Sequence, residues 1–174
     1  MPLQHQDVIL SLGSNLGDRL AWLAQARAAL NAWPDVRLLA SSPVYETEPD
    51  GVPQAFALHS FLNQVVIVGT TLAPEMFSAG IHAIEDRLGR ARGAVPGAPR
   101  TLDIDIIAFG ALCSDAPELT LPHPRAKKRR FVLQPLADLR PDFVFPGDTQ
   151  NVSDLLRALP PTPRVTRYPA AGQG

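Results

Sequence analysis

Two aspartates in one short run, Asp103 and Asp105, are the residues whose types and spacing most directly indicate chemistry. In a β-strand, side chains alternate between the two faces, so the two carboxylates point the same way, about 6.5 to 7 Å apart. Two carboxylates on one half-buried face repel each other unless a cation lies between them. Mg²⁺ is commonly held by one or two carboxylates together with substrate phosphates and water. The pair therefore predicts a Mg²⁺ site, and the alternative is a solvated strand face on which two aspartates happen to alternate.

Three arginines close to the acidic pair indicate what the metal would accompany. Arg90 and Arg92 precede the pair in a segment rich in glycine and proline, and Arg100 stands at the start of the strand. Guanidinium groups bind phosphate oxygens in bidentate fashion and stay charged at any working pH. The chain has no glycine-rich phosphate loop ending in Lys-Ser or Lys-Thr, because the segment at Gly13 lacks the lysine. Side chains and metal should therefore hold a polyphosphate here.

The acidic pair falls in the last strand of a regular pattern of elements. Apolar and β-branched runs predict strands, and apolar positions three and four apart predict helices. The expected strands cover residues 7–12, 37–46 with a break at Pro43, 61–68 and 102–109, and the expected helices end near Asn31 and run from Pro74 to Leu88. This order is that of a ferredoxin-like split βαβ unit. We expect an α+β fold: a βαββαβ core whose helices cover one face of a largely antiparallel sheet, with extra C-terminal short helices near 130–139 and 152–159.

Length and composition predict one domain. The 174 residues are 45% hydrophobic and 19% charged, and we expect the domain over residues 1–160 with a flexible C-terminal tail over 161–174. The net charge of −1 gives no reason to expect a nucleic acid or a membrane as partner. The single cysteine, Cys113, allows no internal disulfide and fits a cytoplasmic protein. No apolar run approaches the ~20 residues that span a bilayer, and no pattern requires an oligomer, so we expect a monomer.

Several segments together resemble a known family, the 6-hydroxymethyl-7,8-dihydropterin pyrophosphokinases of folate biosynthesis. The acidic run Pro99–Asp105 and the Pro-His-Pro run Leu121–Arg125 are the most specific of these segments. The other matching segments are Leu12–Arg19, Tyr45–Pro49, Phe61–Asn63, Ile84–Glu85 and Gly89–Arg92. In order and spacing, the matches cover roughly residues 7–147.

The resemblance implies a reaction. The two terminal phosphates of ATP would pass as one unit to the hydroxymethyl oxygen of the pterin, with release of AMP. Two Mg²⁺ ions would be bound, both by the residues that match Asp103 and Asp105, and would neutralise charge on the transferring group. Residues that match Arg90 and Arg92 belong to a catalytic loop that closes over the nucleotide, and the glycines and prolines of residues 91–99 suit such a loop.

The resemblance also implies two substrate sites. The ATP site would use residues matching Glu85, Arg92, Arg100, Ile106, Thr120, His123 and Arg129. The pterin site would use residues matching Thr47, Phe61, Asn63 and Phe131. An aromatic face and a side-chain amide suit a flat heterocycle with an amide-like edge. Without the resemblance, core packing is the ordinary explanation for the two phenylalanines.

Two other functions remain open from the sequence. Gly97 and Asp50 depart from residues common in the family, which suggests a catalytically lapsed paralogue that still binds pterin or nucleotide. The basic run at residues 127–130 suggests a ferredoxin-like nucleic-acid-binding module, although aromatic residues total only 6% and no aromatic RNA-binding pattern lies on a strand. The acidic pair and its arginines favour the enzyme over both.

Overall fold

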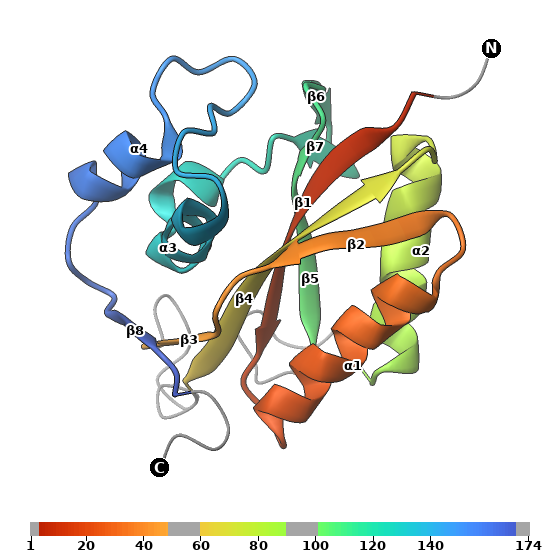
Figure 1. Cartoon of the computed structure of the whole chain (residues 1–174), viewed down its shortest axis with the longest axis horizontal. Coiled ribbons are helices and arrows are strands. Elements are labelled where there is room, and N and C mark those ends of the chain that lie inside the picture. Colours follow the sequence, from red (N-terminus) through yellow and green to blue (C-terminus); the bar gives the residue numbers. More distant parts are fainter. Residues whose placement is uncertain (1–3, 49–59, 90–100, 170–174) are drawn as a thin grey trace.

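A computed structural model of the chain describes residues 4–48, 60–89 and 101–169, and its central elements follow the predicted order (Figure 1). They are β1 (Gln6–Ser14), α1 (Arg19–Ala32), β2 (Val36–Ser41), β3 (Tyr45–Thr47), β4 (Phe61–Thr70), α2 (Pro74–Arg87) and β5 (Asp103–Phe109). The expected strand over residues 37–46 is thus two strands separated by the segment that contains Pro43, a residue that cannot donate to a sheet ladder.

The strand pairing is that of the split βαβ unit. The order runs β5-β1-β4, with β2 and β3 both paired along the far edge of β4, and every one of these pairs is antiparallel. Because β1 and β2 are each antiparallel to β4, they run parallel to each other with β4 between them. The predicted α+β class and ferredoxin-like core are confirmed.

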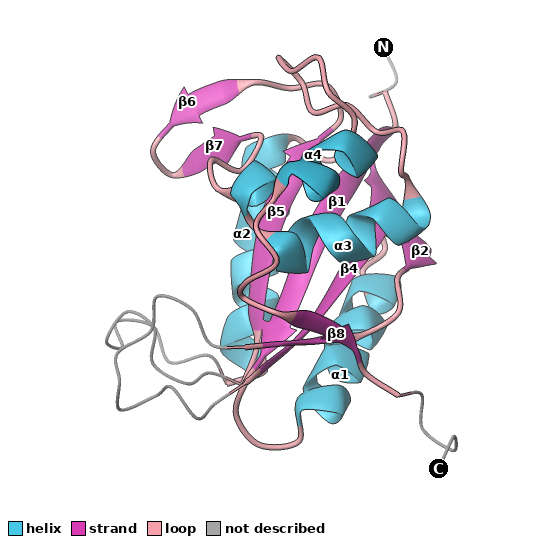
Figure 2. Cartoon of the chain, turned by 90° about the vertical axis from the view of Figure 1, so that its left-hand side faces the viewer, coloured by secondary structure: helices cyan, strands magenta, loops and turns pink. Residues whose placement is uncertain are grey.

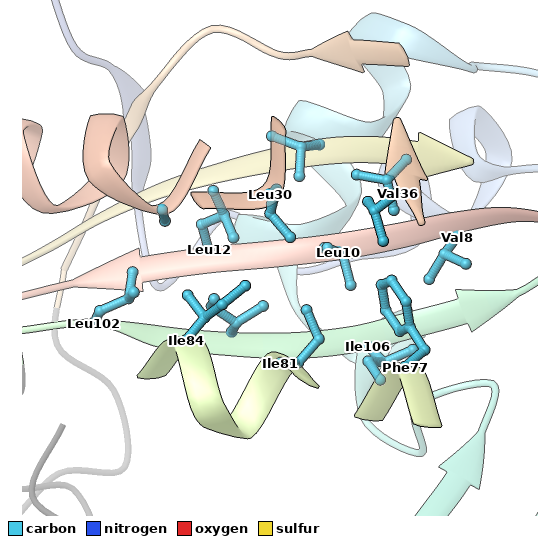
Figure 3. Packing of buried hydrophobic residues seen from close by; sticks show 14 of the residues in the cluster. Val8, Leu10, Leu12, Leu30, Val36, Phe77, Ile81, Ile84, Leu102 and Ile106 are labelled. Atoms are coloured by element: carbon cyan, nitrogen blue, oxygen red, sulfur yellow. The ribbon is translucent and has the colours of Figure 1, made fainter. Parts of the chain in front are cut away.

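One face of the sheet packs against α1 and α2 (Figure 3). The labelled side chains include alternate positions of β1, such as Leu10, and the inner stripe of α2, such as Ile81, as the period of each element requires. Arg27 breaks the apolar stripe of α1 because its guanidinium donates a hydrogen bond to the sheet. The acceptor is the side-chain carbonyl Oε1 of buried Gln64, at 2.6 Å. The Gln64 amide in turn donates to the Ser42 carbonyl at 2.6 Å.

The opposite face is also covered by helices, which corrects the expectation that helices cover only one face. The helices α3 (Arg130–Leu139) and α4 (Val152–Ala158) lie on this second side (Figure 2). Their apolar residues join those of the sheet in a second core. The strands β1 and β4 are apolar on both faces there, as Ile9 and Ile67 illustrate, so this face has to be buried as well.

The remaining elements connect these layers. A short hairpin of β6 (Ser114–Ala116) and β7 (Leu119–Leu121) follows β5, and a 3₁₀ helix (Ala126–Lys128) leads into α3. The strand β8 (Val165–Arg167) pairs with β3, so the ladder extends into residues 161–174, where we expected a flexible tail. None of the helices in the described ranges has the length and apolar character needed to cross a membrane.

Phe77 is the largest side chain joining α2 to the sheet, and it provides a test of this packing. It is fully buried, stacks on Trp33 with ring centroids 5.3 Å apart and meets Phe109 edge-on at 5.7 Å. Phe77→Ala should lower the free energy of unfolding by about 3–5 kcal/mol in urea titration. Met76→Ala, at the neighbouring position with 63% exposure, should change it by less than about 0.5 kcal/mol. Equal losses in the two variants would contradict the assigned core.

Candidate functional site

The strand β5 presents Asp103 and Asp105 on one face, as predicted. The residues between and after them, Ile104 and Ile106, are buried against α2, whereas both aspartates are partly exposed. In the register with β1, Asp103 lies opposite Gly13 and Asp105 lies opposite Ser11. The small neighbours leave space above the carboxylates on this face of the sheet.

Glu85 fixes the backbone between the two aspartates. Its side chain is fully buried on α2, and Oε2 accepts a hydrogen bond from the Ile104 backbone N–H at 2.9 Å. Oε1 lies 3.2 Å from Nδ1 of His82. A carboxylate held in this way sets the position of the strand at its functional end. The structure therefore gives Glu85 a positioning role, and its predicted contact with ATP stays a prediction.

Arg129 connects the acidic pair to an aromatic ring. Its Nη1 lies 3.8 Å from Oδ2 of Asp105, and its guanidinium carbon lies 5.3 Å from the centre of the Phe131 ring. The planar guanidinium can stack on a ring while its edge faces an anion. A predicted nucleotide contact and a predicted pterin contact are thus neighbours at the start of α3.

A cavity of about 260 Å³ opens beside Asp105 and collects several of the predicted ATP residues. Ile106, Thr120 and His123 line it. The segment that carries His123 is held against β5 by a hydrogen bond from the His123 backbone N–H to the Ile107 carbonyl, 2.8 Å long. The cavity is also lined by three residues that the sequence did not indicate, Ser78 and His82 of α2 and Glu118 of the hairpin.

The electrostatics of His123 favour the neutral imidazole. Burial, followed by the positive charges of Arg129 and Arg125, lowers its pKa to about 4, although Asp103 acts in the opposite direction. Its Nδ1 accepts the Arg125 backbone N–H at 3.1 Å, which leaves Nε2 as the protonated nitrogen of the neutral ring. His123 therefore offers the cavity a hydrogen-bond donor without a charge at neutral pH.

Three of the predicted pterin residues lie together at the start of β4. The Thr47 hydroxyl donates to Oδ1 of Asn63 at 2.6 Å, and both side chains are buried. Across the β3–β4 ladder, Thr47 lies opposite Phe61. The remaining predicted residue, Phe131, comes from α3 and is partly buried against the second core.

Gly13 joins the two halves of the site. It pairs with Asp103 on one side and with Asn63 on the other, so the three residues form one row across β5, β1 and β4. Adjacent strands lie about 4.8 Å apart, which places Asp103 and Asn63 on the same face at about 10 Å. A Cβ at Gly13 would lie 3.1 Å from Nδ2 of Asn63 and 3.7 Å from the Phe61 ring, so a side chain there would press on the predicted pterin contacts.

The donor set suits Mg²⁺ bound together with a polyphosphate. Across residues 4–48, 60–89 and 101–169, no group of three or more acidic, histidine or cysteine side chains is arranged to hold a metal. The acidic pair alone supplies two carboxylates on one partly exposed face, and substrate phosphates and water are the usual remaining ligands of Mg²⁺. The predicted phosphate ligands Arg90, Arg92 and Arg100 lie outside the described residues, as do the departures Asp50 and Gly97.

Comparison with known proteins agrees with this geometry. The family model described as 7,8-dihydro-6-hydroxymethylpterin-pyrophosphokinase matches residues 9–141. A protein of Pseudomonas aeruginosa named 2-amino-4-hydroxy-6-hydroxymethyldihydropteridine pyrophosphokinase is 41% identical over 155 residues, which are 89% of this chain and 93% of that protein. A protein of the same name from Methylorubrum extorquens is 42% identical over 154 residues, 88% of this chain and 93% of that protein.

A solved structure with the same fold is titled "Crystal Structure Analysis of the HPPK-DHPS in complex with substrates". It superposes with a TM-score of 0.67 at 13% identity and covers 87% of this chain. This chain spans 43% of the length of that solved chain. At this identity, the likeness concerns the fold alone.

Because the pKa of His123 is lower in the folded chain than its ordinary value, the free energy of unfolding should depend on pH. Between about pH 6.5 and about pH 4, the unfolded chain binds a proton at residue 123 that the folded chain does not. Stability that is present above pH 6.5 should therefore be lost progressively as the pH falls to about 4. His123→Gln should remove this part of the slope when the free energy of unfolding is measured by urea titration at several pH values. Parallel pH profiles for the wild type and the variant would contradict the prediction.

Proposed function

The chain belongs to the 7,8-dihydro-6-hydroxymethylpterin-pyrophosphokinase family, and from this membership and the site geometry we propose that it transfers pyrophosphate from ATP to 6-hydroxymethyl-7,8-dihydropterin. The hydroxymethyl oxygen forms a bond to the β-phosphorus, the bond from that phosphorus to the oxygen bridging to the α-phosphate breaks, and AMP and the hydroxyl proton are released. The observation that carries the proposal is the row Asp103–Gly13–Asn63, in which a proposed metal ligand and a proposed pterin contact share one face of the sheet.

The nucleotide is proposed to lie along β5. Its base enters the cavity beside Ile106 and Thr120, where neutral His123 donates a hydrogen bond. The phosphates then extend over the two aspartates, with Arg129 contributing a positive charge next to Asp105. Arg90, Arg92 and Arg100 are proposed as further phosphate ligands.

Asp103 and Asp105 are proposed to hold two Mg²⁺ ions. Bound Mg²⁺ would neutralise phosphate charge and stabilise the charge that develops on the transferring group. The protein contributes the fixed direction of the two carboxylates, since Glu85 holds the backbone N–H of the residue between them. Alignment of the two substrates on one rigid sheet face accounts for much of the catalysis expected of phosphoryl transfer.

The pterin is proposed to lie between Phe61 and Phe131 with its amide-like edge on Asn63. The Thr47 hydroxyl holds Oδ1 of that amide at 2.6 Å, so the amide is oriented before the substrate arrives. Its NH₂ group and the second lone pair of Oδ1 are then directed at the heterocycle. The aromatic rings supply the faces on which the pterin stacks.

The basic run at residues 127–130 does not favour the nucleic-acid alternative. Lys127 pairs with Asp148 at 2.8 Å, Arg129 faces Asp105, and Arg130 donates to backbone carbonyls of residues 159 and 160. Three of the four cations are therefore engaged within the fold. We further propose that the protein acts as a monomer and that it works in the cytoplasm; the single cysteine agrees with the second of these proposals.

The assay for AMP separates the enzyme from a lapsed paralogue. With MgATP and the reduced hydroxymethylpterin, the wild type should release AMP, and Asp105→Asn should lower kcat by at least about 100-fold because a metal-binding carboxylate becomes a neutral amide. Asp142→Asn, an exposed position away from the site, should keep wild-type activity. Release of ADP, or no turnover by the wild type, would exclude the pyrophosphokinase.

A further inference from the structure

The end of the chain joins the two walls of the proposed pterin site. Residues 159–168, called here the C-terminal strap, leave α4, pass the start of α3 and end beside β3 (Figure 1). The view in Figure 2 shows β8 crossing the same end of the sheet. The strap lies beyond residue 141, where the match to the family model ends.

The strap extends the sheet at the strand that carries Thr47. Within β8, Val165 lies opposite Thr47 and Thr166 lies opposite Glu46. The ladder continues on both sides: the Glu48 N–H donates to the Arg164 carbonyl at 3.1 Å, and the Tyr168 N–H donates to the Val44 carbonyl at 2.8 Å. Each of the three residues of β3 pairs with one residue of β4 and one residue of β8. Without β8, β3 would be an edge strand with half as many strand partners.

A second attachment fixes the strap to the start of α3. The Arg130 guanidinium donates from Nη2 to the Leu159 carbonyl at 3.0 Å and to the Pro160 carbonyl at 2.9 Å, and from Nε to the Pro160 carbonyl at 3.2 Å. Arg130 stands between Arg129 and Phe131 in the sequence. The strap is therefore attached to Arg130, which lies between Arg129, a proposed phosphate contact, and Phe131, a proposed stacking residue for the pterin.

A third attachment reaches the start of β4. Tyr168 packs against the first core, and the Arg19 guanidinium lies 5.9 Å from the centre of its ring. Nη1 of Arg19 donates to the Ser60 carbonyl at 3.0 Å and to Oε2 of Glu46 at 2.8 Å. Ser60 directly precedes Phe61 in the sequence. The end of the strap is therefore linked, through Arg19 and Ser60, to Phe61 of the proposed pterin site.

We propose that the C-terminal strap is a positioning element for the pterin site, which holds Thr47, Phe61 and Phe131 at a fixed separation. The inference rests on the proposed function, since it concerns the pterin subsite of the same reaction. Residues 159–168 are not among the residues that line the cavity proposed for the base of ATP. Loosening the strap should therefore weaken pterin binding while kcat at saturation and the KM for ATP stay close to their wild-type values.

A separate contact keeps α3 on the sheet when the strap is loosened. The Tyr45 hydroxyl donates to the Asp138 carboxylate, which joins β3 to the C-terminal half of α3. Burial and the Asp138 carboxylate raise the pKa of Tyr45 to about 12, so the hydroxyl keeps its proton at working pH. The fold should therefore survive changes confined to the strap.

The alternation of hydrogen bonds in the ladder provides a matched pair of variants. The Tyr168 N–H donates to the Val44 carbonyl and the Glu48 N–H donates to the Arg164 carbonyl, so both pairs stand at hydrogen-bonded positions of the ladder. By the alternation of antiparallel pairing, the Glu46/Thr166 pair between them also stands at a hydrogen-bonded position, and the Arg167 N–H points away from β3. Thr166 and Arg167 are both exposed. Thr166→Pro removes a ladder donor, whereas Arg167→Pro removes an N–H that no strand of the described chain accepts.

Steady-state kinetics and equilibrium binding of the dihydropterin test the proposal on the full chain. Thr166→Pro should raise the KM and the Kd for the pterin about three- to tenfold, and Arg167→Pro should leave both within about twofold of the wild type. Arg130→Ala should act like Thr166→Pro, and Arg130→Lys should recover part of the loss. If Thr166→Pro does not fold, the two Arg130 variants decide by the same criterion.

Two results would overturn the positioning role. One is an unchanged pterin KM and Kd in Thr166→Pro and Arg130→Ala, and the other is an equal loss for ATP and pterin. Failure of the proposed function looks different, because the wild type itself would then release no AMP. In that case the Kd for the pterin still reports on the strap.

Discussion

The site depends on one constraint, the alternation of side chains along β5. Ile104 and Ile106 are buried against α2, and this burial obliges Asp103 and Asp105 to face the other way. Repulsion between two neighbouring carboxylates works against the arrangement, and aliphatic burial on the opposite face works for it. Glu85 adds a specific contact, because its carboxylate accepts the N–H of the residue between the two aspartates. A fold that holds two carboxylates side by side in this way favours the binding of a cation between them.

The other parts of the site are positioned relative to that strand. Gly13 of β1 sets the distance from Asp103 to Asn63, and Arg129 at the start of α3 contacts Asp105 and Phe131. The second core, which α3 and α4 form with the sheet, is therefore more than a stabilising layer. It brings an aromatic ring and a cation to the face on which the carboxylates lie.

The sequence was sufficient to predict features that depend on residues close together in the chain. The period of the strands and helices predicted the βαββαβ core, and the alternation around Asp103 predicted one acidic face. The second helical layer could not be placed, since the apolar stripe of α3 says that it is buried but does not say against which face. The role of Gly13 depends on the strand register. The register is set by the way the strands pair in the folded sheet, so the sequence of β1 alone did not predict which residues lie opposite Gly13. The pairing of β8 with β3 is a contact between residues more than 110 positions apart. The segment around β8, with prolines at positions 160, 161, 163 and 169, resembles a loop in sequence.

Departures from a regular pattern also had physical reasons that only the structure supplies. Arg27 interrupts an apolar stripe because it satisfies the buried amide of Gln64. Ser78 and His82 line the cavity although nothing in their sequence context distinguishes them from the exposed side of a helix. Such residues act through neighbours that are distant in the chain.

In the proposed reaction, the β- and γ-phosphates move together from ATP to the pterin. The most direct measurement uses ATP labelled with ³²P at the β-phosphate, mixed with Mg²⁺, the reduced hydroxymethylpterin and the protein, followed by separation of the products. The label should appear in the pterin diphosphate, and the AMP should be unlabelled. Label recovered in ADP would show transfer of a single phosphoryl group and would rule out pyrophosphoryl transfer.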